Sequence, residues 1–157
     1  MIPSDDRTTA IPSGGVLAPI GRRALGAIID QVLVLVPVAI GVLVSGYEPG
    51  TSLTDESLLW LNAISVGVGF VYEAVMIGIL GRTVGKIATG TRVVSATTGG
   101  RVGWFAAVQR AIVPAVAAAV PEAGILFSAV VYGMAAFGPL RQGLHDRAAG
   151  TVVIMSR

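Results

Sequence analysis

The sequence predicts an all-α integral membrane protein, a four-helix bundle with a small two-stranded β element on its cytoplasmic side. Hydrophobic residues make up 54% of the 157-residue chain and charged residues only 13%, with a mean hydropathy of +0.79. A soluble domain carries about 25% charged residues, so most of this surface is expected to face a lipid bilayer. The apolar residues gather in long runs separated by segments that hold arginines, as in multi-pass membrane chains.

The first twenty residues, 1–20, are predicted to form a flexible tail because they are rich in Pro, Ser and Thr and show no hydrophobic periodicity. The membrane domain is then expected at 21–157. Its first helix is predicted at about 24–46, an apolar run long enough to cross a hydrocarbon core of about 30 Å. A kink is expected at Pro37, in the middle of this run.

Arg22 and Arg23, placed before this run, resemble the start of an export signal. A polar tail precedes them, however, and Asp30 interrupts the apolar residues that follow. An uncleaved membrane helix therefore fits the pattern better than a cleaved signal peptide.

A second membrane helix is predicted at about 58–80. Asn62, Ser65, Gly69 and Glu73 recur within it at steps of three and four residues, so they share one helix face. Small and polar residues on a common face allow membrane helices to pack closely. This face is expected to point into the bundle.

The segment 81–103 is predicted to be a polar cytoplasmic loop with a short β-branched strand. Three of its basic side chains, Arg82, Lys86 and Arg92, are expected to anchor the loop at anionic lipid headgroups. Its start resembles a nucleotide phosphate loop, but the glycines are one residue too close and Ile87 replaces the magnesium-binding hydroxyl. A nucleotide site is therefore not expected.

Two short helices are predicted next, at about 104–120 and 122–140, with a break at Pro121-Glu122. The first would be only about 25 Å long, and the sequence leaves open whether it spans the membrane or dips in and returns. A strand is predicted at 151–155. Because Gly90-Thr91-Arg92-Val93-Val94 resembles Gly150-Thr151-Val152-Val153-Ile154, these two segments are predicted to pair.

The basic residues predict the orientation. They are concentrated in the N-terminal tail, the 81–103 loop and the C-terminal segment, and the loop between the first two helices has none. Short basic loops stay in the cytoplasm, so both termini are predicted to be cytoplasmic. The excess of arginine over lysine, with abundant Ala, Gly and Val, favours a bacterial protein and hence the inner (plasma) membrane.

Three charged side chains lie inside the predicted helices: Asp30, Glu73 and Arg110. Each would cost roughly 2.5–3.5 kcal/mol in a bilayer if left alone, so they are expected to converge on one interior spot. Arg23 lies on the same helix face as Asp30, seven residues earlier. Two interpretations stay open: the charges fix helix register, or a carboxylate binds and releases a proton or cation.

The remaining polar features predict no enzyme. His145-Asp146 has no nucleophile or further metal ligand nearby in the sequence, so no catalytic residue, metal site or cofactor is expected; helix capping or a salt bridge with an arginine is predicted instead. The chain has no cysteine. Its arginines separate apolar runs rather than forming a basic face interleaved with aromatic residues, so no nucleic-acid partner is expected.

Three motifs together resemble the RDD family of membrane proteins, from about Ala18 to the C-terminus. Arg23 to Asp30 (RALGAIID) resembles the first motif, and Gly81 to Val94 (GRTVGKIATGTRVV) resembles the G-x-T-x-G-K segment. Leu144 to Val153 (LHDRAAGTVV) resembles the closing motif, which supplies Asp146. Glu73 and Arg110 also fall where the family carries an acid and an arginine, and Val84 departs from its usual proline or leucine.

The resemblance implies an RDD-family membrane protein with proton-coupled cation transport of the Na⁺/H⁺ type. Asp30, Glu73 and Asp146 would then bind the cation and proton, with Arg23 and Arg110 as charge partners. Four short helices are few for a transport path, so a homo-oligomer or a membrane protein partner is expected. The alternative is a non-transporting accessory or assembly subunit of a larger membrane complex.

Overall fold

The computed structural model describes residues 14–44, 54–120 and 122–156, and 68% of these are helical. The elements in chain order are the helices α1 (Ile20–Val44), α2 (Asp55–Leu80) and α3 (Val84–Ala88), the strand β1 (Thr91–Ser95), the helices α4 (Trp104–Ala118) and α5 (Gly124–Gly133), the 3-10 turn η1 (Met134–Phe137), the helix α6 (Leu144–Ala148) and the strand β2 (Thr151–Met155).

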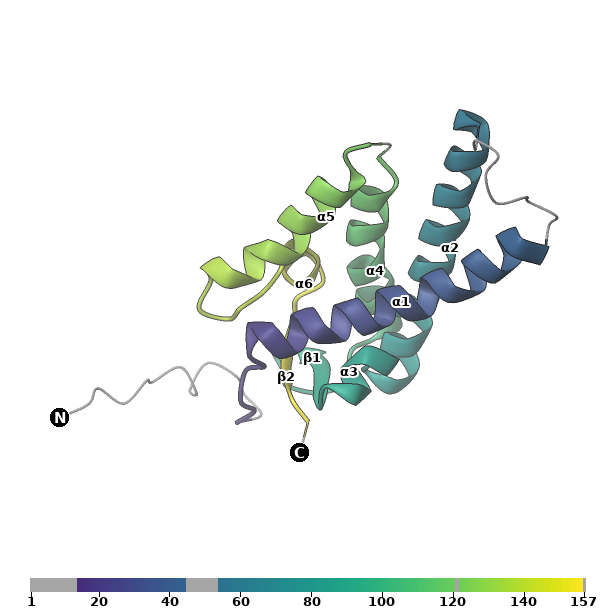
Figure 1. Cartoon of the computed structure of the whole chain (residues 1–157). Coiled ribbons are helices and arrows are strands. Elements are labelled where there is room, and N and C mark those ends of the chain that lie inside the picture. The colour runs from purple at the N-terminus through teal and green to yellow at the C-terminus, as the bar shows by residue number, and fades with distance from the viewer. Residues whose placement is uncertain (1–13, 45–53, 121, 157) are drawn as a thin grey trace.

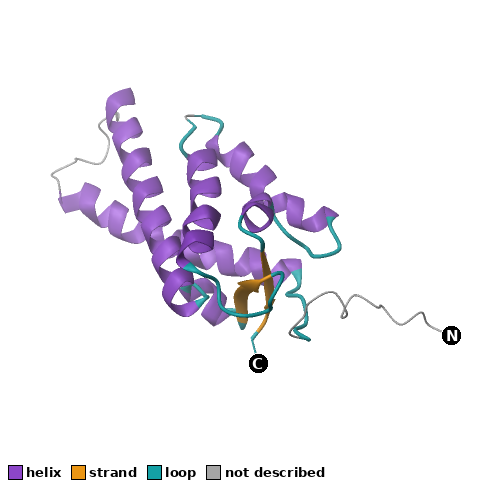
Figure 2. Ribbon diagram, turned by 180° about the vertical axis from the view of Figure 1, so that it is seen from behind, coloured by secondary structure: helices purple, strands orange, loops and turns teal. Residues whose placement is uncertain are grey.

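The helices differ in direction. α2 and α4 stand side by side, α5 leans against α4, and α1 crosses in front of α2 and α4 rather than running along them (Figure 1). The two strands and α3 lie at one end of the molecule, and α6 lies between β2 and α5 (Figure 1). The view from behind shows the strands at the same end (Figure 2). The short elements therefore form a polar end from which the long helices project.

The predicted apolar helices at 24–46, 58–80, 104–120 and 122–140 correspond to α1, α2, α4 and α5. The last predicted helix ends early: α5 ends at Gly133 and the 3-10 turn η1 continues to Phe137. The turn stops there because Gly138 precedes a proline and takes the extended backbone that proline favours. The five-residue helices α3 and α6 were not predicted, since each is too short to show a period in the sequence.

Two helices, α1 and α2, have the length and composition needed to cross a membrane. Only 6% of the most apolar window of α1 is buried within the protein, and 17% of that of α2. A core helix of a soluble protein would bury most of such a window. These two helices therefore present apolar side chains outward along most of their length.

The two-stranded sheet confirms the predicted pairing. β1 and β2 are antiparallel, with Val93 opposite Val153, and both side chains are buried. Each strand follows a short helix and a glycine in the left-handed region, Gly90 at φ 64° and Gly150 at φ 61°. The likeness between the two strand sequences therefore reflects a helix–glycine–strand unit that occurs twice.

The end of the predicted flexible tail is instead packed against β2, so this part of the prediction was wrong. Leu17 forms an isolated bridge with Ile154, and the Ala18 N–H donates to the Val153 carbonyl at 3.0 Å. Both Leu17 and Ala18 are buried. The backbone of this segment forms hydrogen bonds with the free edge of the sheet. These bonds stabilise an ordered conformation even though the preceding residues are polar. Residues 1–13 lie outside the described residues.

A close approach between two glycines fixes α1 against α3. A Cβ on Gly85 would overlap the Gly26 carbonyl, and a Cβ on Gly26 would press on the backbone of Gly85 and the hydroxyl of Thr89. Glycine is used where two backbones come this close. The contact brings the first residues of α3 onto α1 beside Asp30.

Gly85→Ala is therefore expected to destabilise the protein by roughly 1–3 kcal/mol, the usual cost of overpacking. The measurement is the thermal unfolding midpoint of the purified protein. Gly41→Ala is the matched control, because Gly41 lies on α1 with open space around its Cβ position. An equal midpoint for Gly85→Ala and Gly41→Ala would contradict the close-approach argument.

Candidate functional site

A buried carboxylate on α6, that of Asp146, holds two arginines from other helices. Its Oδ1 accepts from the Arg110 Nε at 3.1 Å and lies 3.0 Å from the Arg110 Nη2, and its Oδ2 accepts from Arg23. Asp146 is 0% exposed and Arg110 1% exposed. The Gly143 N–H also donates to Oδ2, at 3.2 Å. We call these residues, with Glu73, the Asp146 cluster.

Arg110 links the Asp146 cluster to α2. Its Nη1 donates to the Glu73 Oε1, so one guanidinium on α4 bridges carboxylates from α2 and α6. Such a bridge keeps both the arginine and the acids from being buried alone, which is the costly arrangement. The predicted convergence of Glu73 and Arg110 is present in the structure.

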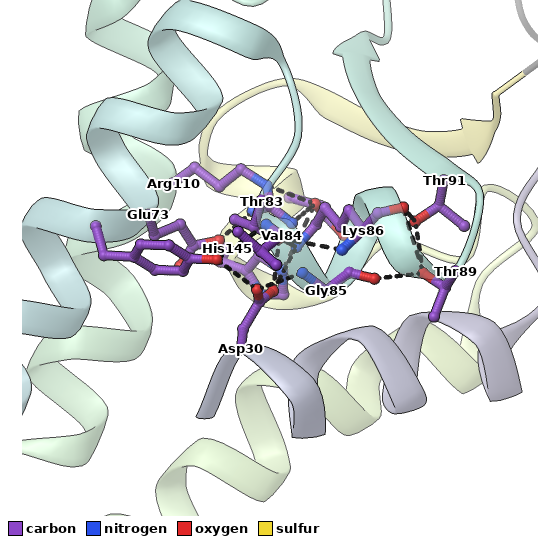
Figure 3. A network of polar contacts seen from close by, with 12 residues as sticks. Asp30, Glu73, Thr83, Val84, Gly85, Lys86, Thr89, Thr91, Arg110 and His145 are labelled. Atoms are coloured by element: carbon purple, nitrogen blue, oxygen red, sulfur yellow. Dashed lines mark hydrogen bonds and ion pairs between the residues drawn. The ribbon is translucent and has the colours of Figure 1, made fainter. Parts of the chain in front are cut away.

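Asp30 forms a second group beside α3. Its Oδ1 accepts from the Tyr72 hydroxyl and the Gly85 N–H, both at 2.7 Å, and its Oδ2 accepts from the Thr83 hydroxyl at 2.5 Å. The Lys86 Nζ lies 3.9 Å from Oδ2. Figure 3 shows Asp30 pointing from α1 toward Gly85, with Lys86 and Thr83 beside it. We call these residues the Asp30 cluster.

The partners differ from the expectation in two respects. Arg23 shares a helix face with Asp30 but pairs with Asp146, and Asp30 lies instead beside Lys86. Lys86 lies within the Asp30 cluster, with its side chain 14% exposed, so the expected headgroup contact is not the contact that it makes. Arg82 and Arg92 are exposed, and their role at lipid headgroups stays a prediction.

The charges of the two clusters balance. Asp30, Glu73 and Asp146 supply three carboxylates, and Arg23, Lys86 and Arg110 supply three cations. Burial alone would raise the pKa of Asp146, but the Arg110 guanidinium, with help from Arg23, holds it well below its usual range. The pKa of Lys86 is lowered by burial and then by the charge of Arg110.

The predicted helix cap and arginine salt bridge of the His145-Asp146 pair are both made by Asp146. His145 itself takes part in neither. It is 1% exposed, its ring lies 4.7 Å from that of Tyr132, and its Nδ1 has no hydrogen-bond partner. Burial lowers its pKa to about 3, so the ring is neutral at ordinary pH. The nearest acid is Asp146, whose Oδ1 is 3.6 Å from Nε2. His145 therefore packs as a neutral aromatic side chain.

A cavity of about 330 Å³ opens beside both clusters, between α1, α2, α4 and α5. Asp30, Glu73 and Lys86 line it, and so does the polar stripe predicted to face inward. The second oxygen of Glu73, Oε2, makes no hydrogen bond to any described residue. Other polar groups in the lining are Gln31, Asn62, Ser65, Tyr72, Thr83, Ser128 and Tyr132.

Sequence reasoning did not single out five polar residues of the cavity lining: Gln31, Tyr72, Thr83, Ser128 and Tyr132. Tyr72 precedes Glu73, and Thr83 lies two residues before Gly85 in the glycine motif. Neither side chain is charged, so neither stands out in the sequence as an isolated charge in an apolar segment does. Among the described residues, no group of three or more histidine or acidic side chains is placed to hold a metal ion. A bound ion would instead have to use mixed oxygen ligands.

Asp146→Asn is expected to destabilise the protein by about 3–5 kcal/mol, because Arg23 and Arg110 would lose a buried counter-charge. Thermal unfolding measures the effect, with Asp55→Asn on the exposed start of α2 as the control. A double variant that also carries Arg110→Met should lose less than the sum of the two single changes. Strictly additive losses would mean that the pair does not interact.

His145 is expected to make the protein less stable in mild acid. Between its usual pKa of 6.5 and the folded value of about 3, the unfolded chain binds a proton at His145 and the folded chain does not. The free energy of unfolding therefore falls with falling pH, by at most about 1.4 kcal/mol per unit from this group. His145→Phe should reduce this slope between pH 6.5 and 4.5 in unfolding experiments; an unchanged slope would refute the neutral buried histidine.

The comparison with protein families identifies the family of the chain. The model of the RDD family matches residues 17–150, which include every member of the two clusters. No match was found among curated proteins or among solved structures. The matched region covers most of the chain and includes Arg23, Asp30, Arg110 and Asp146. The chain belongs to the RDD family.

Proposed function

We propose that this RDD-family protein is an integral membrane protein that exchanges a monovalent cation for protons at the cavity between α1, α2, α4 and α5. The observation that carries the proposal is the placement of two carboxylates, Asp30 and Glu73, on the lining of one polar cavity. The proposal requires that these four helices lie in the bilayer as one domain.

The exposed faces of the long helices support a lipid environment. Leu25, Ile28 and Val32 of α1 are each more than half exposed, and α2 exposes Leu59, Trp60 and Val71 to a similar degree. Leaving such side chains in water costs about 25 cal/mol for each Å² of apolar surface. α1 is also held by Arg23 to the C-terminal part of the chain, which favours a retained helix over a cleaved leader.

The placement in the membrane follows from the basic segments. The end that holds the sheet, α3 and α6 would lie in the cytoplasm of a bacterium, with both termini, at the inner membrane. α4 has 15 residues and so is about 22 Å long, shorter than a hydrocarbon core of about 30 Å. Helices α4 and α5 would therefore enter the bilayer and return to the cytoplasmic side as a pair, whether or not they reach its opposite surface.

The three carboxylates of the two clusters have different roles in this proposal. Both oxygens of Asp146 are occupied by arginines, so Asp146 anchors the helices rather than binding an ion. Asp30 and Glu73 face the cavity, and Glu73 keeps one oxygen without a hydrogen bond among the described residues. A carboxylate oxygen holds either a proton or a cation, so the two compete, and this competition couples their movements.

The test is transport by purified protein in liposomes. A Na⁺ gradient should drive proton movement, followed with a pH-sensitive dye. Asp30→Asn and Glu73→Gln should each reduce the flux by roughly tenfold or more, because an interaction with a charged group is worth about 1.5–3 kcal/mol. Asp55→Asn, outside the cavity, is the control. Flux that persists in both cavity variants would refute the proposal.

A second candidate function, a non-transporting accessory subunit, is favoured by an apolar groove of about 780 Å³ on α2 and α4. Trp60, Phe70 and Ile112 line it, and a partner helix or a second copy of the chain could fill such a groove. Absence of any cation-driven flux, together with stable co-purification of one membrane protein in constant ratio, would support this candidate.

A further inference from the structure

We propose that the Lys86 ammonium is a tethered counter-ion of the cavity: it occupies the place of a monovalent cation beside Asp30 and moves away when that cation binds. The inference rests on the proposed function, because it describes the same site in the absence of its cation. The inference identifies the group that competes with the incoming cation for the Asp30 carboxylate.

The geometry places the ammonium at a cation position. The Lys86 Nζ lies 3.4 Å from the Thr83 hydroxyl oxygen and 3.9 Å from the Asp30 Oδ2 (Figure 3). Carboxylate and hydroxyl oxygens are the kind of ligand that hard cations take. Lys86 also lines the cavity, so an ion in the cavity would meet it at these oxygens.

Lys86 is held more weakly than the other cations of the two clusters. Arg110 donates hydrogen bonds to Glu73 and Asp146, and Arg23 donates to Asp146. Lys86 donates one long hydrogen bond, to the Thr83 hydroxyl at 3.4 Å. It makes none to Asp30, since 3.9 Å exceeds the range of about 2.7–3.2 Å for such bonds. A lysine ammonium on a flexible stem can leave its partner more readily than a planar, multiply bonded guanidinium.

Asp30 does not depend on Lys86 for its position. Its oxygens accept hydrogen bonds from the Tyr72 hydroxyl, the Thr83 hydroxyl and the Gly85 N–H, none of which carries a charge. The carboxylate therefore stays in place when the ammonium departs. The vacated position keeps its oxygen ligands for an incoming ion.

Charges from four other elements act on the ammonium. Arg110 repels it, and the carboxylates of Asp30, Glu73 and Asp146 attract it. Glu73 lines the same cavity and offers a second carboxylate within it. The displaced ammonium can therefore stay in the cavity, with its charge compensated there.

The chain has a single lysine, so this side chain can be observed alone. Protein labelled with ¹³C at the lysine ε-carbon should give one such signal in detergent micelles. On titration with NaCl, with choline chloride keeping the ionic strength constant and pH fixed, the signal should shift and saturate. In Asp30→Asn the saturating shift should be absent. A signal that stays in place while Na⁺ binds would overturn the inference.

A direct measurement of ²²Na⁺ binding is the second test of the inference. Lys86→Met should bind Na⁺ roughly tenfold more tightly, as expected if the ammonium occupies the site about nine-tenths of the time. Lys86→Arg should bind Na⁺ no more tightly than the wild type, because a guanidinium leaves the carboxylate less readily than an ammonium. Arg82→Met, an exposed residue of the same segment, is the matched control for loss of one positive charge. The thermal unfolding midpoint of each variant verifies folding, and the labelled wild-type protein tests the inference even if Lys86→Met does not fold.

The outcomes separate the two proposals. Equal or weaker Na⁺ binding by folded Lys86→Met, with binding retained in the wild type, would overturn the role of Lys86 and leave the proposed function standing. No Na⁺ binding by the wild type or by any variant would overturn both. Tighter binding by Lys86→Met together with a saturating shift of the lysine signal supports the tethered counter-ion.

Discussion

The burial of one carboxylate shapes the whole site. Asp146 is removed from water, and a carboxylate in that position costs several kcal/mol unless opposite charges and hydrogen bonds surround it. Its two guanidinium partners come from α1 and α4, far away in the sequence. The site can therefore be satisfied only when α1, α4 and α6 meet. Arg110 extends the same constraint to α2 through Glu73.

Asp30 and Asp146 interact with their surroundings in different ways. Fixed guanidinium groups surround Asp146, which leaves it no freedom to change partners. Uncharged donors hold Asp30 in place, and the only nearby cation, within the described part of the chain, is a lysine that makes no hydrogen bond to it. A locked acid suits a structural anchor, and a pre-positioned acid at a cavity suits exchange of a small cation.

The polar end of the molecule provides the frame for both acids. Two helix–glycine–strand units bring α3 and α6 to the same small sheet, and the segment before α1 joins its edge. α3 and its N-cap residue Thr83 supply two of the three donors for Asp30, and α6 carries Asp146 itself. The sheet thus connects the two clusters through backbone hydrogen bonds, which do not depend on the ionic state of either.

The sequence by itself determined the apolar helices, the two strands and their pairing, and five of the six charged members of the clusters. These features depend on local hydropathy, β-branching and the cost of isolated charges, which can be read residue by residue. Only the tertiary structure decided the partners. Arg23 and Asp30 share a helix face, but α6 packs at one end of that face and α3 at the other, so Arg23 meets Asp146 and Asp30 meets the Lys86 segment. Long-range packing also buried His145 and Ala18, because no local pattern records which surface a neighbouring element will cover.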